Sequence, residues 1–263
     1  MTQKTAYRAN KTTADILHEP FNNPTTINRR ESQLLLGEIF EVEAADGAFF
    51  KGRSRLDGYK GYVHRDSLTL NEGRATHFCS AGLSLIRRDP DIKSREVMPV
   101  SFMSRLEIDK HSLKNGFMRV RGGLGWIPAN HIEPLASLKE RVDYVSIALR
   151  MQGMPYRYGG RSTLGLDCSA LVQITMTASG WPRIPRDTDM QEKSERLGHE
   201  INPANLGVGD IVFFPQHVGI MVSQTKIISA TEKSANVMIE NIHEMAARQN
   251  GITTVRRPNT VPA

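Results

Sequence analysis

The first half of the chain contains an internal repeat, and this repeat limits the folds open to it. Residues 58–68 (GYKGYVHRDSL) are echoed by residues 122–132 (GGLGWIPANHI), with Gly-Tyr-Val aligned on Gly-Trp-Ile. Around each copy, short alternating apolar stretches are separated by turn residues, a pattern typical of small β domains. The sequence therefore predicts two similar all-β domains in tandem, over residues 10–72 and 73–136.

Both copies resemble bacterial Src-homology-3-like (SH3-like) barrels, small units that end in a Gly-Trp/Tyr-Val/Ile strand. An early loop supports the alignment, since His18-Glu19-Pro20 is echoed by Arg88-Asp89-Pro90. The resemblance implies five or six strands in each barrel.

Composition and hydropathy indicate the class of protein and its location in the cell. With 263 residues, 39% hydrophobic and 24% charged, the chain has the make-up of a globular protein with room for two or three small domains. No apolar run approaches the length of a membrane span and none follows the polar N-terminus, so we expect a cytoplasmic protein without a membrane partner. No feature indicates an oligomeric state.

The net charge of +6 comes from dispersed residues and isolated arginine pairs, with no basic stripe interleaved with aromatic residues. A generally basic surface is therefore the better interpretation, and no nucleic acid partner is expected. The sequence also lacks a Cys/His cluster with zinc-ligand spacing and a phosphate loop of the Walker type. We expect neither a metal nor a cofactor.

One of the two cysteines, Cys168, precedes a predicted helix. Leu171, Val172 and Met176 recur at helical spacing, with Asp167 or Ser169 as the N-terminal cap, and glycine and proline at 180 and 182 end the pattern. A thiol at a helix N-terminus meets unpaired N–H groups, which favour the thiolate of a nucleophile. The alternative is a small buried packing residue, which is how we interpret Cys79. Because the two cysteines fall in different predicted domains, no disulfide is expected.

A histidine downstream strengthens the catalytic interpretation of the cysteine. Residues 211–214 and 218–222 read as two buried strands, and His217 lies where the second begins. A helix-borne cysteine followed by a strand-borne histidine is the papain-like order, in which the imidazole takes the thiol proton to form an ion pair.

Residues 137–263 resemble the catalytic domain of the NlpC-type papain-like cysteine peptidases, which cleave peptidoglycan stem peptides. Five pieces match in the family's order: residues 155–160 (PYRYGG), 166–173 (LDCSALVQ), 184–188 (IPRDT) with Gln191, 206–214 (LGVGDIVFF) and 217–220 (HVGI). The resemblance implies an α+β fold for the whole chain, with Cys168 as nucleophile and His217 as base.

The third catalytic position departs from the family. That position usually holds His, sometimes Asn or Gln, on the strand after the histidine strand, and here residues 226–230 place Ser229 there. A hydroxyl can accept a hydrogen bond from the imidazole Nδ1–H, although it is less basic than a histidine ring. That Ser229 is only a small strand residue stays open.

Two SH3-like barrels ahead of this domain resemble the γ-D-glutamyl-L-diamino acid endopeptidases, which cut L-Ala-γ-D-Glu-diamino acid murein stem peptides and require a free N-terminal L-alanine. This resemblance implies that substrate is bound by Asp167, Ser169 and Tyr156 of the cleft and by Glu31 and Tyr59 of the first barrel. For the D-glutamate carboxylate we expect Arg186 and Thr188, with a surface arginine as the alternative.

We therefore expect a cysteine peptidase of cell-wall peptide recycling, which would meet stem peptides already trimmed from the glycan. Two alternatives stay open. The first, kept open by Ser229, is a catalytically weakened protein that binds murein peptides. The second is an amidase or acyltransferase on the same scaffold.

Overall fold

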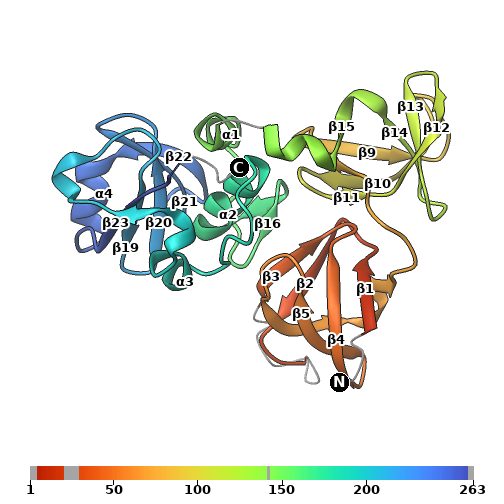
Figure 1. The fold of residues 1–263 in the computed structure, drawn as a ribbon, viewed down its shortest axis with the longest axis horizontal. Coiled ribbons are helices and arrows are strands. Elements are labelled where there is room, and N and C mark those ends of the chain that lie inside the picture. Colours follow the sequence, from red (N-terminus) through yellow and green to blue (C-terminus); the bar gives the residue numbers. More distant parts are fainter. Residues whose placement is uncertain (1–4, 21–29, 141–142, 260–263) are drawn as a thin grey trace. The chain divides into compact units, whose positions relative to one another are not determined.

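The computed structural model describes residues 5–20, 30–140 and 143–259. The predicted domain ranges also include residues 21–29, 141–142 and 260–263, which lie outside the described residues. The chain forms two compact units, Met1–Ser137 and Leu138–Ala263 (Figure 1). The first unit is built of β-strands and the second combines helices with a sheet, as the predicted α+β class requires.

The first barrel is a single sheet with the strand order β3-β2-β6-β5-β4-β1-β7. Its elements are β1 (Thr5–Ala9), β2 (Thr13–Leu17), β3 (Arg30–Leu35), β4 (Ile39–Asp46), β5 (Phe49–Ser54), β6 (Lys60–His64), the 3-10 turn η1 (Arg65–Ser67) and β7 (Leu68–Leu70). Strand β6 carries the repeated Gly-Tyr-Val, and Tyr62 pairs with Leu17 of β2 and Lys51 of β5. The alternating buried residues Ile16, Leu34 and Val63 fill the core.

The second barrel has a similar order of elements along the chain. Its elements are β8 (His77–Cys79), β9 (Leu83–Arg87), β10 (Glu96–Ser101), β11 (Arg105–Leu106), β12 (Ile108–Lys114), β13 (Phe117–Val120), β14 (Gly125–Pro128), η2 (Ala129–His131) and β15 (Ile132–Pro134), followed by η3 (Leu135–Glu140). Unlike the first barrel, it divides its strands between two sheets, β10-β9-β14-β13-β12 and β11-β8-β15. Strand β14 takes the place of β6, since Trp126 pairs with Arg87 and Arg119. Both barrels have more strands than the resemblance implied, because short strands such as β7 in the first and β8, β11 and β15 in the second join the ladders.

The two barrels share a core at one point. Leu36, in the turn after β3, is only 2% exposed and packs in the second barrel's core with Cys79, Ile86 and Val100. The next residue, Gly37, has a φ of +78°, and a Cβ built there would lie 1.8 Å from the Arg105 carbonyl oxygen, so only glycine fits. The Arg105 N–H donates to the Leu36 carbonyl at 2.7 Å.

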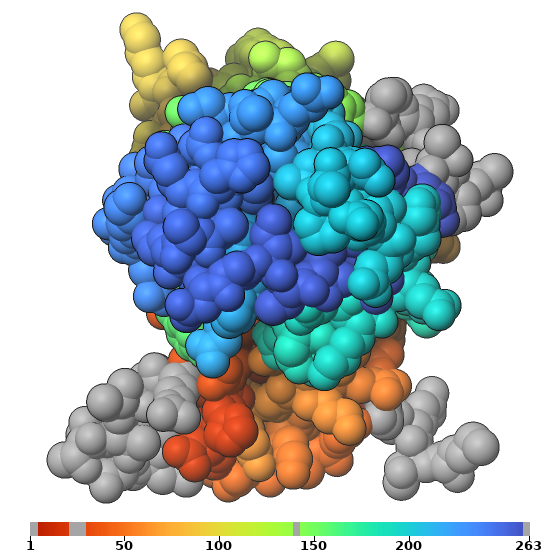
Figure 2. Space-filling view, turned by 90° about the vertical axis from the view of Figure 1, so that its left-hand side faces the viewer, coloured from red at the N-terminus to blue at the C-terminus, as the bar shows by residue number. Residues whose placement is uncertain are grey.

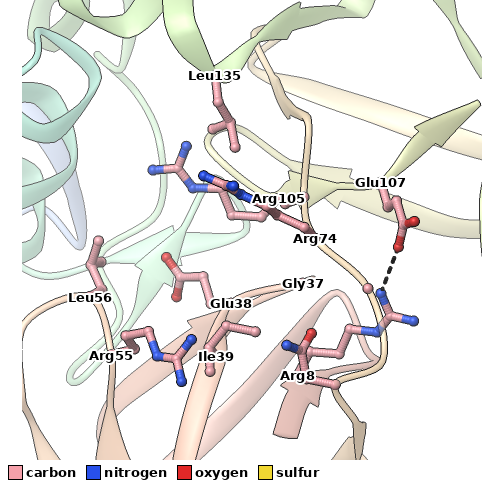
Figure 3. A pocket seen from close by; sticks show the side chains of 13 residues that line it. Arg8, Gly37, Glu38, Ile39, Arg55, Leu56, Arg74, Arg105, Glu107 and Leu135 are labelled. Atoms are coloured by element: carbon pink, nitrogen blue, oxygen red, sulfur yellow. Dashed lines mark hydrogen bonds and ion pairs between the residues drawn. The ribbon is translucent and has the colours of Figure 1, made fainter. Parts of the chain in front are cut away.

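An ion pair and a cavity flank this junction. Arg8 Nη1 of the first barrel lies 3.4 Å from Glu107 Oε2 of the second, as the dashed line in Figure 3 marks. Beside the pair is a pocket of about 300 Å³. Cys79 is fully buried nearby, and burial raises the pKa of its thiol to about 12. That position fits the packing role expected of it.

The second unit contains a six-stranded sheet with the order β18-β23-β19-β20-β21-β22. Its elements are α1 (Tyr144–Arg150), β16 (Arg161–Ser162), β17 (Gly165–Leu166), α2 (Cys168–Ala178), α3 (Thr188–Glu192), η4 (Glu195–Leu197), β18 (His199–Glu200), η5 (Pro203–Asn205), β19 (Ile211–Phe214), β20 (His217–Met221), β21 (Lys226–Thr231), β22 (Asn236–Asn241), α4 (Ile242–Arg248) and β23 (Thr254–Arg257). Strands β18 and β23 pair although they are far apart in sequence, and Figure 2 shows cyan and blue segments side by side.

Helices α2 and α4 both pack against this sheet. Helix α2 contacts β20 and β21 (Figure 1), while Ile242 and Met245 of α4 pack with Phe214, Met221 and Ile227 of the strands. Within the described residues, the longest helix is α2 with 11 residues, and none is long and apolar enough to cross a membrane.

Candidate active site

Helix α2 begins at Cys168 because Asp167 caps it. Asp167 Oδ1 accepts the Ala170 N–H at 2.9 Å, and the predicted apolar positions Leu171 and Val172 are fully buried. The helix ends at Ala178, two residues before Gly180, whose φ is +91°. The thiol therefore stands at the first position of a buried helix, where the sequence placed it.

The histidine and the serine come from neighbouring strands. His217 opens β20 directly after a tight turn in which Gln216 has a φ of +61°, and Ser229 lies in the middle of β21. The His217 Nε2 atom lies 3.1 Å from the Ser229 Oγ atom. We expected Ser229 to meet Nδ1, so the structure corrects which ring nitrogen it holds. Nδ1 is the nitrogen left for the thiol.

Strand β20 also brings the histidine to the cysteine. The backbone N–H groups of Val218, next to His217, and of Ser169 act to lower the pKa of the Cys168 thiol, and Thr188 Oγ1 lies 3.8 Å from its sulfur. The N–H of Cys168 itself donates to no group among the described residues. It is free to meet the oxyanion of an acyl-transfer intermediate.

Burial opposes charge on both groups of the pair. Cys168 is only 8% exposed, and burial together with the neighbouring Asp167 carboxylate raises the pKa of its thiol to about 11. Burial and the nearby Arg248 guanidinium lower the pKa of His217 to about 4. The predicted preference for thiolate at the helix start is outweighed by desolvation. Burial therefore disfavours the thiolate–imidazolium pair that the sequence led us to expect, and the ion pair stays a prediction.

Asp167 and Arg186 form a buried ion pair beneath the nucleophile. Arg186 is 2% exposed, and its Nη1 and Nη2 atoms donate to Asp167 Oδ1 and Oδ2 at 3.0 and 2.7 Å. Asp167 also accepts from Gly159 N and Ser169 Oγ. Each residue therefore neutralises the charge of the other, and contact of either with substrate stays a prediction.

The other predicted binding residues divide between the two units. Ser169 is buried and its hydroxyl bridges Asp167 and Arg186, and its contact with substrate stays a prediction. Tyr156 lines the cleft beside Cys168. Glu31, at a register shift of β3, and Tyr59, just before β6, belong to the first unit, and their contact with substrate stays a prediction.

A cleft of about 300 Å³ opens beside Cys168 and His217 within the second unit. Four polar residues that line the cleft belong to no sequence motif and were not predicted: Glu232, Lys233, Arg248 and Gln249. They lie on the β21–β22 turn and at the end of α4, and only the pairing of those elements brings them to the site. Within the described residues, no group of three or more His, Cys, Asp or Glu side chains is placed to hold a metal ion.

A thiol at the start of a helix, an imidazole on the adjacent sheet and a polar group holding the far ring nitrogen define a papain-like cysteine peptidase. Residues 153–256 match the NlpC/P60 family, and residues 21–68 match the bacterial dipeptidyl-peptidase SH3 domain.

Similar proteins match most of the chain. The chain is 26% identical over 217 residues to Dipeptidyl-peptidase 6 of Lysinibacillus sphaericus, a match covering 75% of this chain and 79% of that protein. It is 25% identical over 240 residues to Gamma-D-glutamyl-L-lysine dipeptidyl-peptidase of Bacillus subtilis (strain 168), covering 83% and 78%. A crystal structure of an NlpC/P60 family protein from Bacillus cereus ATCC 10987 shares the fold, with a TM-score of 0.82, 19% identity, and coverage of 98% and 100%.

Proposed function

We propose that the protein cleaves murein stem peptides between γ-D-glutamate and the diamino acid, and that it requires a free N-terminal L-alanine. The observation that carries this proposal is the length of the match to relatives named for dipeptidyl-peptidase activity, which spans three quarters or more of the chain. A peptidase domain alone would match over the second unit only.

The described groups support an acyl-enzyme route. As the Cys168 sulfur attacks the γ-carbonyl carbon of D-glutamate, the thiol proton passes to His217 Nδ1, and the Cys168 N–H stabilises the oxyanion. Ser229 holds the imidazole through Nε2–H. The imidazolium then gives its proton to the leaving amine, the amide bond breaks and a thioester forms. Water, deprotonated by His217, cleaves the thioester and restores the thiol.

The free amine requirement would come from the first barrel. Asp167 is already neutralised by Arg186, which leaves Glu31 as the acid and Tyr59 as the hydroxyl for the L-alanine ammonium. Strand pairing puts both residues at the end of the barrel where β2 ends, since Leu17 pairs with Arg30 and Tyr62. A stem peptide still attached through L-alanine to glycan has no such ammonium. The role that follows is recycling of released peptides, for which a cytoplasmic location is also a proposal.

Cleavage of L-Ala-γ-D-Glu-diamino acid peptides with free and with acetylated L-alanine tests the proposal, with mass analysis of the products. We expect the acetylated peptide to be cleaved at least 100-fold more slowly, because the Glu31 carboxylate, covered by the bound peptide, would lack its ammonium partner. Glu31→Gln and Tyr59→Phe should each reduce kcat/KM for the free peptide. Glu72→Gln and Tyr7→Phe, in the same unit, are the matched controls. Equal cleavage of free and acetylated peptides would overturn the amine requirement.

A weakened peptidase that mainly binds murein peptides is the competing proposal. Ser229 favours it, because a hydroxyl stabilises an imidazolium less than the family's usual histidine does. The same peptides separate the two proposals, since a binding protein would hold them without releasing L-Ala-D-Glu.

A further inference from the structure

The pocket of about 300 Å³ at the junction of the two barrels, here called the junction pocket, is lined by three parts of the first unit. The first barrel contributes Glu38 and Arg55, the segment between β7 and β8 contributes Arg74, and the second barrel contributes Arg105. In Figure 3 the side chains of Arg74 and Arg105 lie between Leu135 and Glu38. The catalytic cleft has an entirely different lining, within residues 156–249.

Arginines outnumber acids around the junction pocket. The Glu107 carboxylate is shared by Arg8 and Arg121, whose Nη1 atoms lie 3.4 and 3.8 Å from its oxygens. Arg55 likewise shares its acid, Glu41, with a second arginine. Because a carboxylate carries a single negative charge, each of these two groups leaves one guanidinium charge unbalanced.

The remaining acid of the lining cannot balance the remaining cations. Glu38 is 6% exposed, and its Oε2 already accepts the Leu35 N–H at 2.9 Å. Its one negative charge faces two arginines, Arg74 and Arg105. Arg74 is exposed and forms no hydrogen bond or ion pair with any other described residue. Even with Arg105 balanced by Glu38, the junction pocket therefore keeps a guanidinium without an acid.

The chemistry of the lining indicates the class of ligand. Guanidinium groups bind carboxylate and phosphate through paired N–H donors, and Ile39, Leu56 and Leu135 add apolar surface to the same pocket. We propose that the junction pocket binds a small anion that carries a carboxylate or phosphate group, held by Arg74 together with Arg105. Because the lining comes from both barrels, the bound anion stabilises the first unit. This inference does not rest on the proposed cleavage.

Calorimetry at low ionic strength, with inorganic phosphate and separately with glutarate, tests the site and distinguishes the two kinds of anion. We expect the full chain to bind at least one of them. Arg74→Gln should weaken that binding at least tenfold, equivalent to about 1.4 kcal/mol. Arg105→Lys keeps the charge but removes the planar fork of donors, and should weaken binding as well. The anion should also raise the midpoint of thermal denaturation of wild type more than that of Arg74→Gln.

Two matched variants separate this site from general attraction to a basic protein. Arg95 is an exposed arginine of the second barrel, outside the junction pocket, and its side chain forms no hydrogen bond or ion pair among the described residues. Arg95→Gln should leave the affinity unchanged, and so should Lys233→Gln at the catalytic cleft. Failure of wild type to bind either anion overturns the proposal, as does an affinity that survives both Arg74→Gln and Arg105→Lys. Equal losses in Arg74→Gln and the two matched variants would also overturn it.

Discussion

The His217 Nε2 atom and the Ser229 Oγ atom lie 3.1 Å apart, in the interior of the second unit. This contact predicts that the hydroxyl holds the imidazole with Nδ1 toward the thiol. Ser229→Ala should therefore lower kcat by about tenfold, the loss of one orienting hydrogen bond of about 1.4 kcal/mol. Ser84→Ala is the matched control, because Ser84 Oγ lies 2.8 Å from His131 Nδ1 in the second barrel, and it should leave kcat unchanged.

Restoring the hydroxyl should restore the rate. Ser229→Thr keeps the oxygen and adds one methyl group, and we expect kcat within about threefold of wild type. Ser229→His is a poor test, because Ser229 is fully buried opposite Met238 and a ring there would overpack the site by about 1–3 kcal/mol. Equal kcat values for Ser229, Ala and Thr enzymes would show that another group holds the imidazole.

Removing the nucleophile should abolish turnover without unfolding the protein. Cys168→Ala is expected to have no measurable peptidase activity and a circular dichroism spectrum like wild type, and His217→Ala should be nearly as inactive. Cys79→Ala, in the core of the other unit, should retain activity while lowering the denaturation midpoint. If Cys168→Ala keeps activity within tenfold of wild type, the assignment of the site is wrong.

The pH dependence of alkylation tests the resting protonation state. The pKa of the Cys168 thiol is raised to about 11, so the thiolate fraction, and with it the iodoacetamide alkylation rate, should rise about tenfold per pH unit between pH 7 and 9. The pKa of His217 is lowered to about 4, so the neutral base is available at every pH above that value. Measured in a Cys79→Ala background, a rate that is level from pH 6 to 9 would instead indicate a thiolate–imidazolium pair.

The buried ion pair beneath the nucleophile should govern both stability and activity. Arg186→Met leaves the Asp167 carboxylate buried without its cation, and we expect a loss of about 3–5 kcal/mol in the free energy of unfolding, measured in urea. Since Asp167 caps the helix of Cys168, kcat should fall as well.

Arg257→Gln is the matched control for that variant. Arg257 also binds a buried carboxylate through two nitrogens, both 2.8 Å from Asp210, but its side chain is 42% exposed. It should reduce stability less and leave kcat unchanged. Equal losses of stability and activity in the two variants would mean that Arg186 has no special part in positioning the nucleophile.

Local sequence signals predicted the parts of the site that depend on near neighbours. The cap, the helical spacing after Cys168 and the strands around His217 all involve groups a few residues apart. The Asp167–Arg186 pair links residues 19 positions apart, and an arginine in sequence reads as a surface residue. Burial, which shifts the pKa of the thiol upward, likewise depends on packing that no motif encodes.

Some residues that line the cleft could not be predicted from the sequence, because they belong to no recognisable motif. Glu232 and Arg248 stand on a turn and a helix end whose sequences are ordinary, and their functional interest comes only from the strand ladder that carries them to His217. Ser229 was found because a family pattern marked its position, but which imidazole nitrogen it meets depends on the ring's orientation.

Leu36 bears on how this architecture can be inherited. Its side chain belongs by sequence to the first barrel, but it packs in the core of the second. Its loss would leave a cavity there and lower the free energy of unfolding by about 2–5 kcal/mol. A recombination event that replaced residues 1–72 with a foreign domain would remove Leu36. The second barrel would then lack part of its own interior. The boundary near Ser137 carries no such penalty within the first unit. The second barrel should therefore be less stable alone than in the pair, which favours transfer of the two barrels together.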